Sequence, residues 1–222
     1  MRNRDILFDA STRYTLPAQR HRAGSLVASV TGLAVDLYPL HGLFECNNTA
    51  YLAKPRATDR FNIDGLQAQI LFILNAARQF FVCRKPGYLF IAMPTHTLMQ
   101  LDLTAALHNV MDQHPMLHDR LVLLCQPDHA YPMLANDTGI HLLAQRLSAM
   151  GIHLGIDIPG NCPAWANTDS LDLLSPYILI RHTGSMGDLT YMNQLASVIK
   201  NCRRKQWPLL VDYQQADSGA MQ

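Results

Sequence analysis

The sequence has few charged side chains and no long hydrophobic run. Charged residues make up 16% of the 222 positions, whereas about 25% is typical of globular proteins. Polar residues interrupt every apolar stretch before it reaches the roughly 20 residues that a membrane-spanning helix needs. Hydrophobic residues nevertheless reach 49%, enough to fill a sizeable core. We therefore expect a soluble folded protein with no membrane span, whose weakly charged surface is easily desolvated against another protein.

Signals for export and for disulfide bonding are also lacking. The N-terminus carries Arg2, Arg4 and Asp5 and has no apolar segment of the signal-peptide type. The five cysteines are an odd number, widely spaced, with no Cys-x-x-Cys pair. This pattern is typical of a reducing compartment, so we expect a cytoplasmic protein. The 18 basic and 17 acidic residues nearly cancel, which argues against a dedicated nucleic-acid binder.

From residue 88 onward, short apolar runs alternate with amphipathic stretches. The runs have the character of buried strands and cover residues 88–93, 121–125, 152–156, 177–180 and 209–211. The spacing of apolar residues predicts helices over 140–150 and 189–199, and an earlier helix with a stripe from Leu66 to Phe81. This alternation is typical of βα units, either in a doubly wound open sheet or in a TIM-type barrel.

The N-terminal residues 1–35 show weak periodicity. We expect them to form an irregular arm or cap, followed by one α/β domain over residues 36–222.

No glycine-rich turn follows any predicted strand, so a Rossmann or P-loop nucleotide site is not expected. In both architectures the chemistry lies at the carboxyl ends of the strands. Those ends offer the polar groups His96, Asp157, Arg181, His182 and Asp212. Two carboxylates are too few for a two-metal hydrolase, which needs several to hold its cations.

The segment over residues 142–186 resembles the EAL domain family of cyclic-di-GMP phosphodiesterases. It reads LLAQRLSAMGIHLGIDIPGNCPAWANTDSLDLLSPYILIRHTGSM, and its Gly151, Asp157 and Tyr177 fall in order on the family's glycine, LALDDFGTG and PDYIKID elements. Upstream, RLVLLCQ over residues 120–126 is similar to the family's RLVLEITE strand. The resemblance spans most of residues 36–215 and implies a TIM-type (β/α) barrel.

Most of the family's site positions carry different residues here. They fall on Ala50 or Tyr51 for the signature glutamate, Ala92 for the metal-binding asparagine, Leu124 for the next glutamate, Asp157 and Ile158 for the aspartate pair, Leu179 for the lysine and Asp212 for the last glutamate. Mg²⁺ demands near-octahedral oxygen coordination, so alanine and leucine at ligand positions remove such a site. We expect no metal, no cofactor and no catalytic residue, with His96, Arg181 and His182 as polar rim groups.

The resemblance thus implies a catalytically inactive EAL-like regulator that contacts another protein in bacterial signalling, motility or adhesion control. Two alternatives stay open. One is a cyclic-di-GMP receptor without hydrolysis, for which Lys54 and Arg181 supply the cations. The other is a residual phosphodiesterase with an altered metal site built from His96, Asp157, His182 and Asp212. A homodimer also stays open.

The sequence after Asp212 is short compared with the family, which continues through a last βα unit. Two possibilities follow: a barrel that is incomplete at its C-terminus, or one whose missing strand is supplied by the N-terminal arm. An incomplete barrel would leave an unpaired strand edge or an exposed apolar helix face that something must cover.

Overall fold

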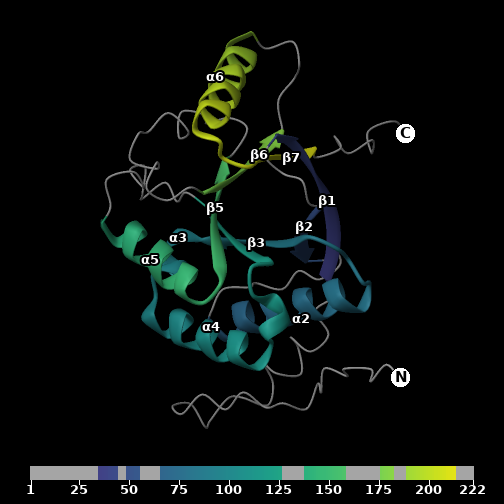
Figure 1. Cartoon of the computed structure of the whole chain (residues 1–222), viewed down its shortest axis with the longest axis vertical. Helices are drawn as coiled ribbons and strands as arrows, with labels where there is room; N and C mark the ends of the chain where they lie inside the picture. Colours follow the sequence, from purple (N-terminus) through teal and green to yellow (C-terminus); the bar gives the residue numbers. More distant parts are fainter. Residues whose placement is uncertain are drawn as a thin grey trace, which may run out of the picture.

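The computed structural model describes residues 35–44, 49–55, 66–126, 138–158, 176–182 and 189–213. Within them seven strands form a closed barrel whose spatial order is the order of the sequence. The strands are β1 (Val35–Phe44), β2 (Ala50–Pro55), β3 (Tyr88–Pro94), β4 (Leu121–Gln126), β5 (Ile152–Ile158), β6 (Tyr177–His182) and β7 (Leu209–Tyr213). Closure excludes the doubly wound open sheet and leaves the barrel alternative (Figure 1).

Helices cover the outside of this barrel. They are α2 (Leu66–Val82), α3 (Thr95–Leu98), α4 (Leu101–Gln113), the 3₁₀ turn η1 (Pro115–Leu117), α5 (Thr138–Ala149) and α6 (Leu189–Lys205). Helices α2 and α4 pack against each other, whereas α6 stands apart from them, beside β6 and β7 (Figure 1). None of the helices in these residue ranges is long and apolar enough to cross a membrane.

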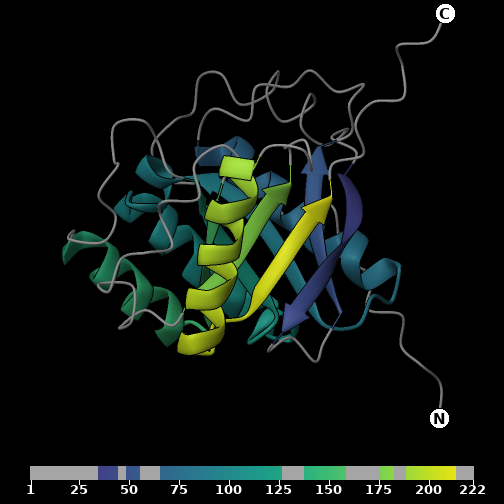
Figure 2. The same cartoon turned by 90° about the horizontal axis from the view of Figure 1, so that it is seen from above.

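Strand β1 closes the barrel. It pairs antiparallel with β2 on one side and with β7 on the other, while the remaining neighbouring strands in the described part are parallel. Figure 2 shows β1, in purple, running against β7, in yellow. A short connection can join antiparallel strands, whereas parallel strands need a long crossover, so β1 and β2 form a hairpin.

The prediction of an unpaired strand edge is therefore wrong, because β1 pairs with both β2 and β7. The seventh strand pairs with β1 through His41 and Gly42, and a register irregularity follows between Gly42 and Phe44. A TIM barrel has eight strands, and the described residues close the circle with seven. The antiparallel strand does this because it accepts a neighbour on both sides.

The barrel interior is a hydrophobic core of its own. Side chains alternate between the two faces of each strand, and the inward set comprises Leu40, Ala50, Leu52, Phe90, Val122, Leu124, Leu179 and Leu210. At the opposite end from the strand carboxyl termini, the rings of Tyr88, His153 and Tyr177 meet with centroids 5.4–6.0 Å apart. The interior is thus filled at its centre and at this end.

Two further clusters lie between the barrel and its helices. The larger one joins β2–β5 to helices α2, α4 and α5, and includes Phe72, Phe80 and Met93. The smaller one packs α6 on strands β5–β7 through Val198 and Cys202. These layers hold the strands in place.

The sequence predictions of strands from residue 88 onward are confirmed, as are helices α2, α5 and α6. The hairpin of β1 and β2 and helix α4 were not predicted from periodicity. The predicted stripe on α2 covers part of its buried surface, since Ile70 and Ala77 are buried, and Ile73, Ala76 and Phe80 beside it are also buried. The predicted arm over residues 1–35 lies almost wholly outside the described residues.

Candidate functional site

The carboxyl ends of the parallel strands bring a small set of polar side chains to one mouth of the barrel. Adjacent-strand pairing sets Asp157 beside Leu179, and Arg181 beside Asp212. Lys54 sits at the end of β2, where it pairs with Asp36 of β1. Because alternate residues of a strand share one face, Lys54, Asp157, Arg181 and Asp212 point toward the same opening.

Arg181 binds Asp157 through two hydrogen bonds. Its Nε donates to Oδ1 at 2.9 Å, and one terminal nitrogen donates to Oδ2 at 2.5 Å. The Asp157 side chain is only 4% exposed, and that of Arg181 is 25% exposed. A two-pronged guanidinium–carboxylate pair is the strong form of this interaction. The Asp157 carboxylate is therefore occupied by a cation from the same chain.

Lys54 neutralises the second carboxylate. Its Nζ lies 2.6 Å from Oδ2 of Asp212, whose side chain is 6% exposed. The same ammonium group lies 5.0 Å from the centroid of the Tyr38 ring, within cation–π range. Lys54 belongs to β2 and Asp212 to β7, so this ion pair bridges the two strands that flank β1.

The side chains at the other predicted site positions pack mainly among hydrophobic residues. Leu124 and Leu179 are fully buried inside the barrel, and Ala50 is buried beside them. Ile158 faces the other way and packs in the cluster under α6. The ring of Tyr51 faces Phe80 on the α2 side, with centroids 6.1 Å apart. Apart from the Tyr51 hydroxyl, these side chains carry no oxygen or nitrogen.

The three predicted rim residues lie in different places in the structure. Arg181 lies at the mouth, as described above. His96 is exposed on the short helix α3, which directly follows β3. His182 ends β6, and its side chain is outside the described set. The proposed cluster of these histidines with Asp157 and Asp212 is therefore not assembled among the described side chains.

The described side chains at the mouth do not fit a divalent metal centre. Among the described side chains, no group of three or more His, Cys, Asp or Glu residues could hold a metal ion. Magnesium needs near-octahedral oxygen coordination and calcium six to eight oxygens. Asp157 and Asp212 each face an internal cation instead.

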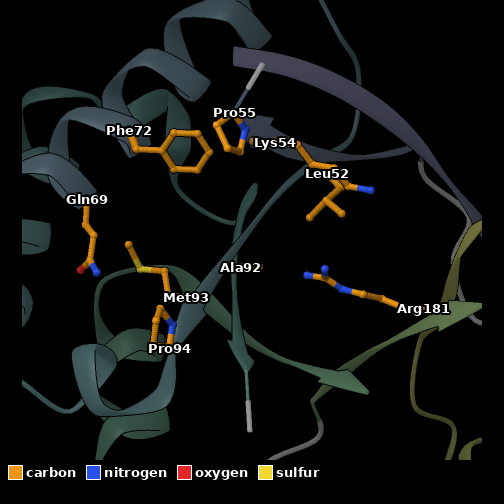
Figure 3. A pocket seen from close by; sticks show the side chains of 10 residues that line it. Leu52, Lys54, Pro55, Gln69, Phe72, Ala92, Met93, Pro94 and Arg181 are labelled. Atoms are coloured by element: carbon orange, nitrogen blue, oxygen red, sulfur yellow. The ribbon is translucent and has the colours of Figure 1, made fainter. Parts of the chain in front are cut away.

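A pocket of about 440 Å³ opens beside these ion pairs (Figure 3). Ala92, Lys54 and Arg181 form the side nearest the barrel axis, and Gln69 and Phe72 of α2 form the other side. In Figure 3 the Gln69 and Phe72 side chains project from α2, and Arg181 reaches in from the opposite side. The pocket thus extends from the barrel mouth into the layer between the strands and α2.

Sequence reasoning missed two features of this site. It treated Lys54 and Arg181 as cations for a bound phosphate, whereas each one holds an aspartate of this chain. It also read α2 only as an apolar stripe. A signal was present, because Gln69 is a polar residue between Ala68 and Ile70, and all three are buried.

Comparison with known proteins identifies the fold of this chain. No model of a known protein family matches the sequence, and no curated protein sequence matches it. Solved structures do match. LapD of Vibrio cholerae, as an apo S helix-GGDEF-EAL chain, has a TM-score of 0.62 at 11% identity, covering 83% of this chain and 49% of LapD. The chain has an EAL-like fold.

Two further structures share this EAL-like fold. The phosphodiesterase PaMucR, solved with c-di-GMP, has a TM-score of 0.60 at 13% identity, covering 83% of this chain and 86% of its own. The Bacillus subtilis YkuI protein, whose EAL domain was solved with c-di-GMP and calcium, has a TM-score of 0.60 at 17% identity, covering 86% and 51%. The chain spans about half the length of LapD and YkuI. The predicted resemblance is confirmed at the level of the fold.

Proposed function

We propose that this chain is a catalytically inactive EAL-like regulator that acts by contacting another protein, in the bacterial signalling, motility or adhesion processes that such domains control. The observation that carries the proposal is the pairing of Asp157 with Arg181 and of Asp212 with Lys54. In an EAL phosphodiesterase the corresponding carboxylates belong to a metal site, which is what the sequence resemblance implies.

The surroundings of the ion pairs support inactivity. Hydrolysis of a phosphodiester on this fold would need metal ligands around the mouth, and Ala92, Leu124 and Leu179 offer only hydrocarbon. Leu124 and Leu179 also have no exposed surface, since they fill the barrel core. A water molecule activated at a metal has no place among these residues.

The composition and the outer surface support a protein partner. The charged fraction is 16%, and several helices carry large exposed hydrophobic side chains. They are Leu101 of α4, Leu142 of α5 and Leu189 of α6, which are 67%, 47% and 75% exposed. The cores of protein interfaces are depleted of charged residues, so a surface with few charges is less costly to desolvate on docking.

A hydrolysis assay tests the inactive half of the proposal. Purified protein is incubated with c-di-GMP and either Mg²⁺ or Mn²⁺, beside an active EAL phosphodiesterase, and linear dinucleotide is measured by chromatography. We expect no product above the metal-only blank. Product that disappears in Asp157→Ala would refute the proposal.

Photocrosslinking tests the partner half. A photoreactive amino acid is placed at position 101, 142 or 189 in cells that produce the protein, with position 200 on the polar, exposed part of α6 as the control. We expect one protein adduct, formed from at least one of the three positions and absent at position 200. Equal labelling at all four positions, or none, would contradict a specific partner.

A c-di-GMP receptor without hydrolysis is the second candidate. The observation in its favour is the pocket beside Lys54 and Arg181, together with the binding of c-di-GMP by PaMucR and YkuI. The ligand would have to compete with Asp157 and Asp212 for those cations. Titration calorimetry with c-di-GMP decides this candidate, since saturable heat without product supports a receptor and no heat removes it.

A further inference from the structure

The end of the barrel opposite the mouth, where the parallel strands begin, gathers most of the positive charge of the described residues. We call this end the floor. Helices α2, α5 and α6 each join two parallel strands, so they run back from the mouth and end at the floor. In Figure 2 the yellow arrow of β7 points away from it. Every lysine and arginine of the described residues lies at the floor, except Lys54 and Arg181 at the mouth.

Helix α6 contributes the densest group of these cations. Its last two turns carry Lys200, Arg203, Arg204 and Lys205, and the helix contains no acidic residue. Lys200, Arg203 and Arg204 are exposed and share one face, because they lie three and four positions apart. No carboxylate of the described ranges forms an ion pair with any of these three. Their charges therefore face solvent.

The other floor cations come from different sides of the barrel. They are Arg78 of α2, Arg84 and Lys85 between α2 and β3, Arg120 directly before β4, and Arg146 in the last turn of α5. The helix dipole favours a cation in a last turn, which accounts for Arg146. It does not account for the residues that directly precede β3 and β4. The positive charge is thus a property of the floor and not of one helix.

Neutral groups hold two of these cations in place. The guanidinium of Arg120 lies 4.8 Å from the centroid of the Phe80 ring, and its Nε donates to the carbonyl oxygen of Gly87 at 3.0 Å. Nζ of Lys205 lies 4.8 Å from the centroid of the Trp207 ring. Rings and carbonyl groups fix the position of a cation without cancelling its charge.

The acidic residues are concentrated at the other end. Of the described carboxylates only Asp112 and Asp119 lie at the floor. The others lie toward the mouth, and they are Asp36, Asp102, Asp157 and Asp212. The described part is therefore polarised, although the whole chain has a net charge of only +1. A face that carries charge of one sign attracts a partner of the opposite sign whatever the net charge of the molecule.

The distribution of the cations decides between anionic partners. They stand on the connections that lead into β3, β4, β5 and β7, so they surround the barrel axis. A nucleic-acid duplex or an acidic peptide is narrow and would touch one side of this ring, whereas a flat bilayer meets all sides together. Val82 at the end of α2 is 67% exposed and adds an apolar group that can enter the headgroup region.

We propose that the floor docks on a membrane surface that carries anionic phospholipids, with the mouth turned away from the bilayer. Each lysine or arginine near an anionic leaflet strengthens binding about fivefold, and the attraction falls off within a Debye length. Leu101 and Leu189 begin α4 and α6 at the mouth end, so lipid and a protein partner would occupy opposite ends. The proposal does not rest on the proposed function, and it agrees with the expected absence of a protein adduct at position 200.

Vesicle sedimentation tests the proposal. The full chain is mixed with sucrose-loaded vesicles of phosphatidylcholine alone, or of three parts phosphatidylcholine and two parts phosphatidylglycerol, and the pelleted protein is measured. We expect binding to the mixed vesicles to be at least about tenfold stronger than binding to phosphatidylcholine. Raising the salt from about 0.1 to 1 M should abolish this difference, because the Debye length shrinks from about 10 to 3 Å.

Two double variants assign the binding to the floor. Arg203→Gln/Arg204→Gln removes two exposed floor cations. The control Gln100→Glu/Asn193→Glu lowers the net charge equally, at exposed positions toward the mouth. We expect the first variant to lower the partition coefficient for mixed vesicles at least about fivefold, and the control to change it by less than about twofold. The comparison of vesicles on the unmodified chain needs no variant to fold.

Four outcomes would overturn the proposal. Equal loss of binding in both variants would mean that net charge and not the floor is recognised. Equal binding to both kinds of vesicle would mean that apolar insertion suffices. Binding of a short fluorescent DNA duplex, without binding to mixed vesicles at the same salt, would assign the floor to nucleic acid. Binding of neither would leave the floor as a solvated surface. None of these results bears on the hydrolysis test.

Discussion

Arg181 binds both carboxylate oxygens of Asp157 from the neighbouring strand, at 2.9 and 2.5 Å. The sequence resemblance implies that this aspartate corresponds to a metal-binding position of the EAL family. Here its positive partner is a side chain of the same chain, two residues beyond Leu179 on β6. This internal ion pair is the central feature of the proposal for the barrel mouth.

Removing that internal cation should destabilise the protein. Arg181→Met keeps an apolar stem but leaves the buried Asp157 carboxylate without its bidentate partner. We expect a loss of about 2 kcal/mol in the free energy of unfolding, less than for a fully buried pair because Arg181 is 25% exposed. Urea denaturation measures the loss, with Arg203→Met on the exposed end of α6 as the control.

The double variant Arg181→Met/Asp157→Leu makes this test specific to the pair. Replacing both charges by apolar groups should restore a large part of the lost stability. If the double variant is as unstable as the sum of the two single variants, the pair is not coupled and the interpretation is wrong.

The Lys54–Asp212 pair should hold the closing strand in place. It joins β2 and β7 across β1, at 2.6 Å. In Lys54→Met we expect the amides of residues 35–42 to exchange with deuterium faster than in the unmodified protein, because local opening of β1 becomes easier. Mass spectrometry of peptic peptides measures this, with residues 121–125 of β4 as the internal control. Uniform acceleration in both peptides would indicate global destabilisation instead.

Gly155 should be intolerant of any side chain. A Cβ at this position would lie 2.6 Å from Cδ2 of Leu124 and 3.2 Å from the carbonyl oxygen of Tyr177. We expect Gly155→Ala to cost about 1–3 kcal/mol through overpacking of the barrel interior. Thermal unfolding of Gly155→Ala, Leu124→Ala and the double variant measures the coupling. The double variant should lose less stability than the sum of the singles, and strict additivity would contradict the clash.

Cys202 should be chemically inert in the folded protein. Burial between α6 and the barrel strands raises the pKa of its thiol from 9.0 to about 12. At pH 8 we expect iodoacetamide to label the exposed Cys83 quickly and Cys202 only as fast as the chain opens. Peptide mass spectrometry gives both rates. Equal labelling of the two thiols would contradict the packing of α6.

The same thiol predicts a pH dependence of stability. Because the folded pKa lies above the unfolded one, the protonated thiol favours the folded state below about pH 9, and this contribution is lost as the pH rises toward 12. Cys202→Ala should therefore show a smaller loss of stability between these values. An unchanged pH profile in the variant would assign the loss to other groups.

The sequence predicted the parallel strands and their helices because each carries a continuous apolar run or a helical period. It did not predict the hairpin, since Val35–Phe44 alternates less clearly and contains Pro39 and Gly42. Nor could it predict that the barrel closes at seven strands, which depends on β1 pairing with both β2 and β7.

The sequence predicted where the two aspartates of the site lie, but not which residues they pair with. Resemblance placed Asp157 and Asp212 at the mouth, and the structure brings both there. Their ion pairs join residues 24 and 158 positions apart in the chain, a contact that no local pattern reveals. The opposite directions of Asp157 and Ile158 follow from strand alternation, which the family alignment alone does not convey.

Direct titration of the protein with Mn²⁺, and separately with Mg²⁺, tests the central claim. If Arg181 and Lys54 have taken the place of metal ions, calorimetry will show no saturable heat with either cation up to millimolar concentration. Chelators will then leave the melting temperature unchanged. Saturable binding that is lost in Asp157→Asn or Asp212→Asn would contradict the account, because it would show that the carboxylates still serve a metal.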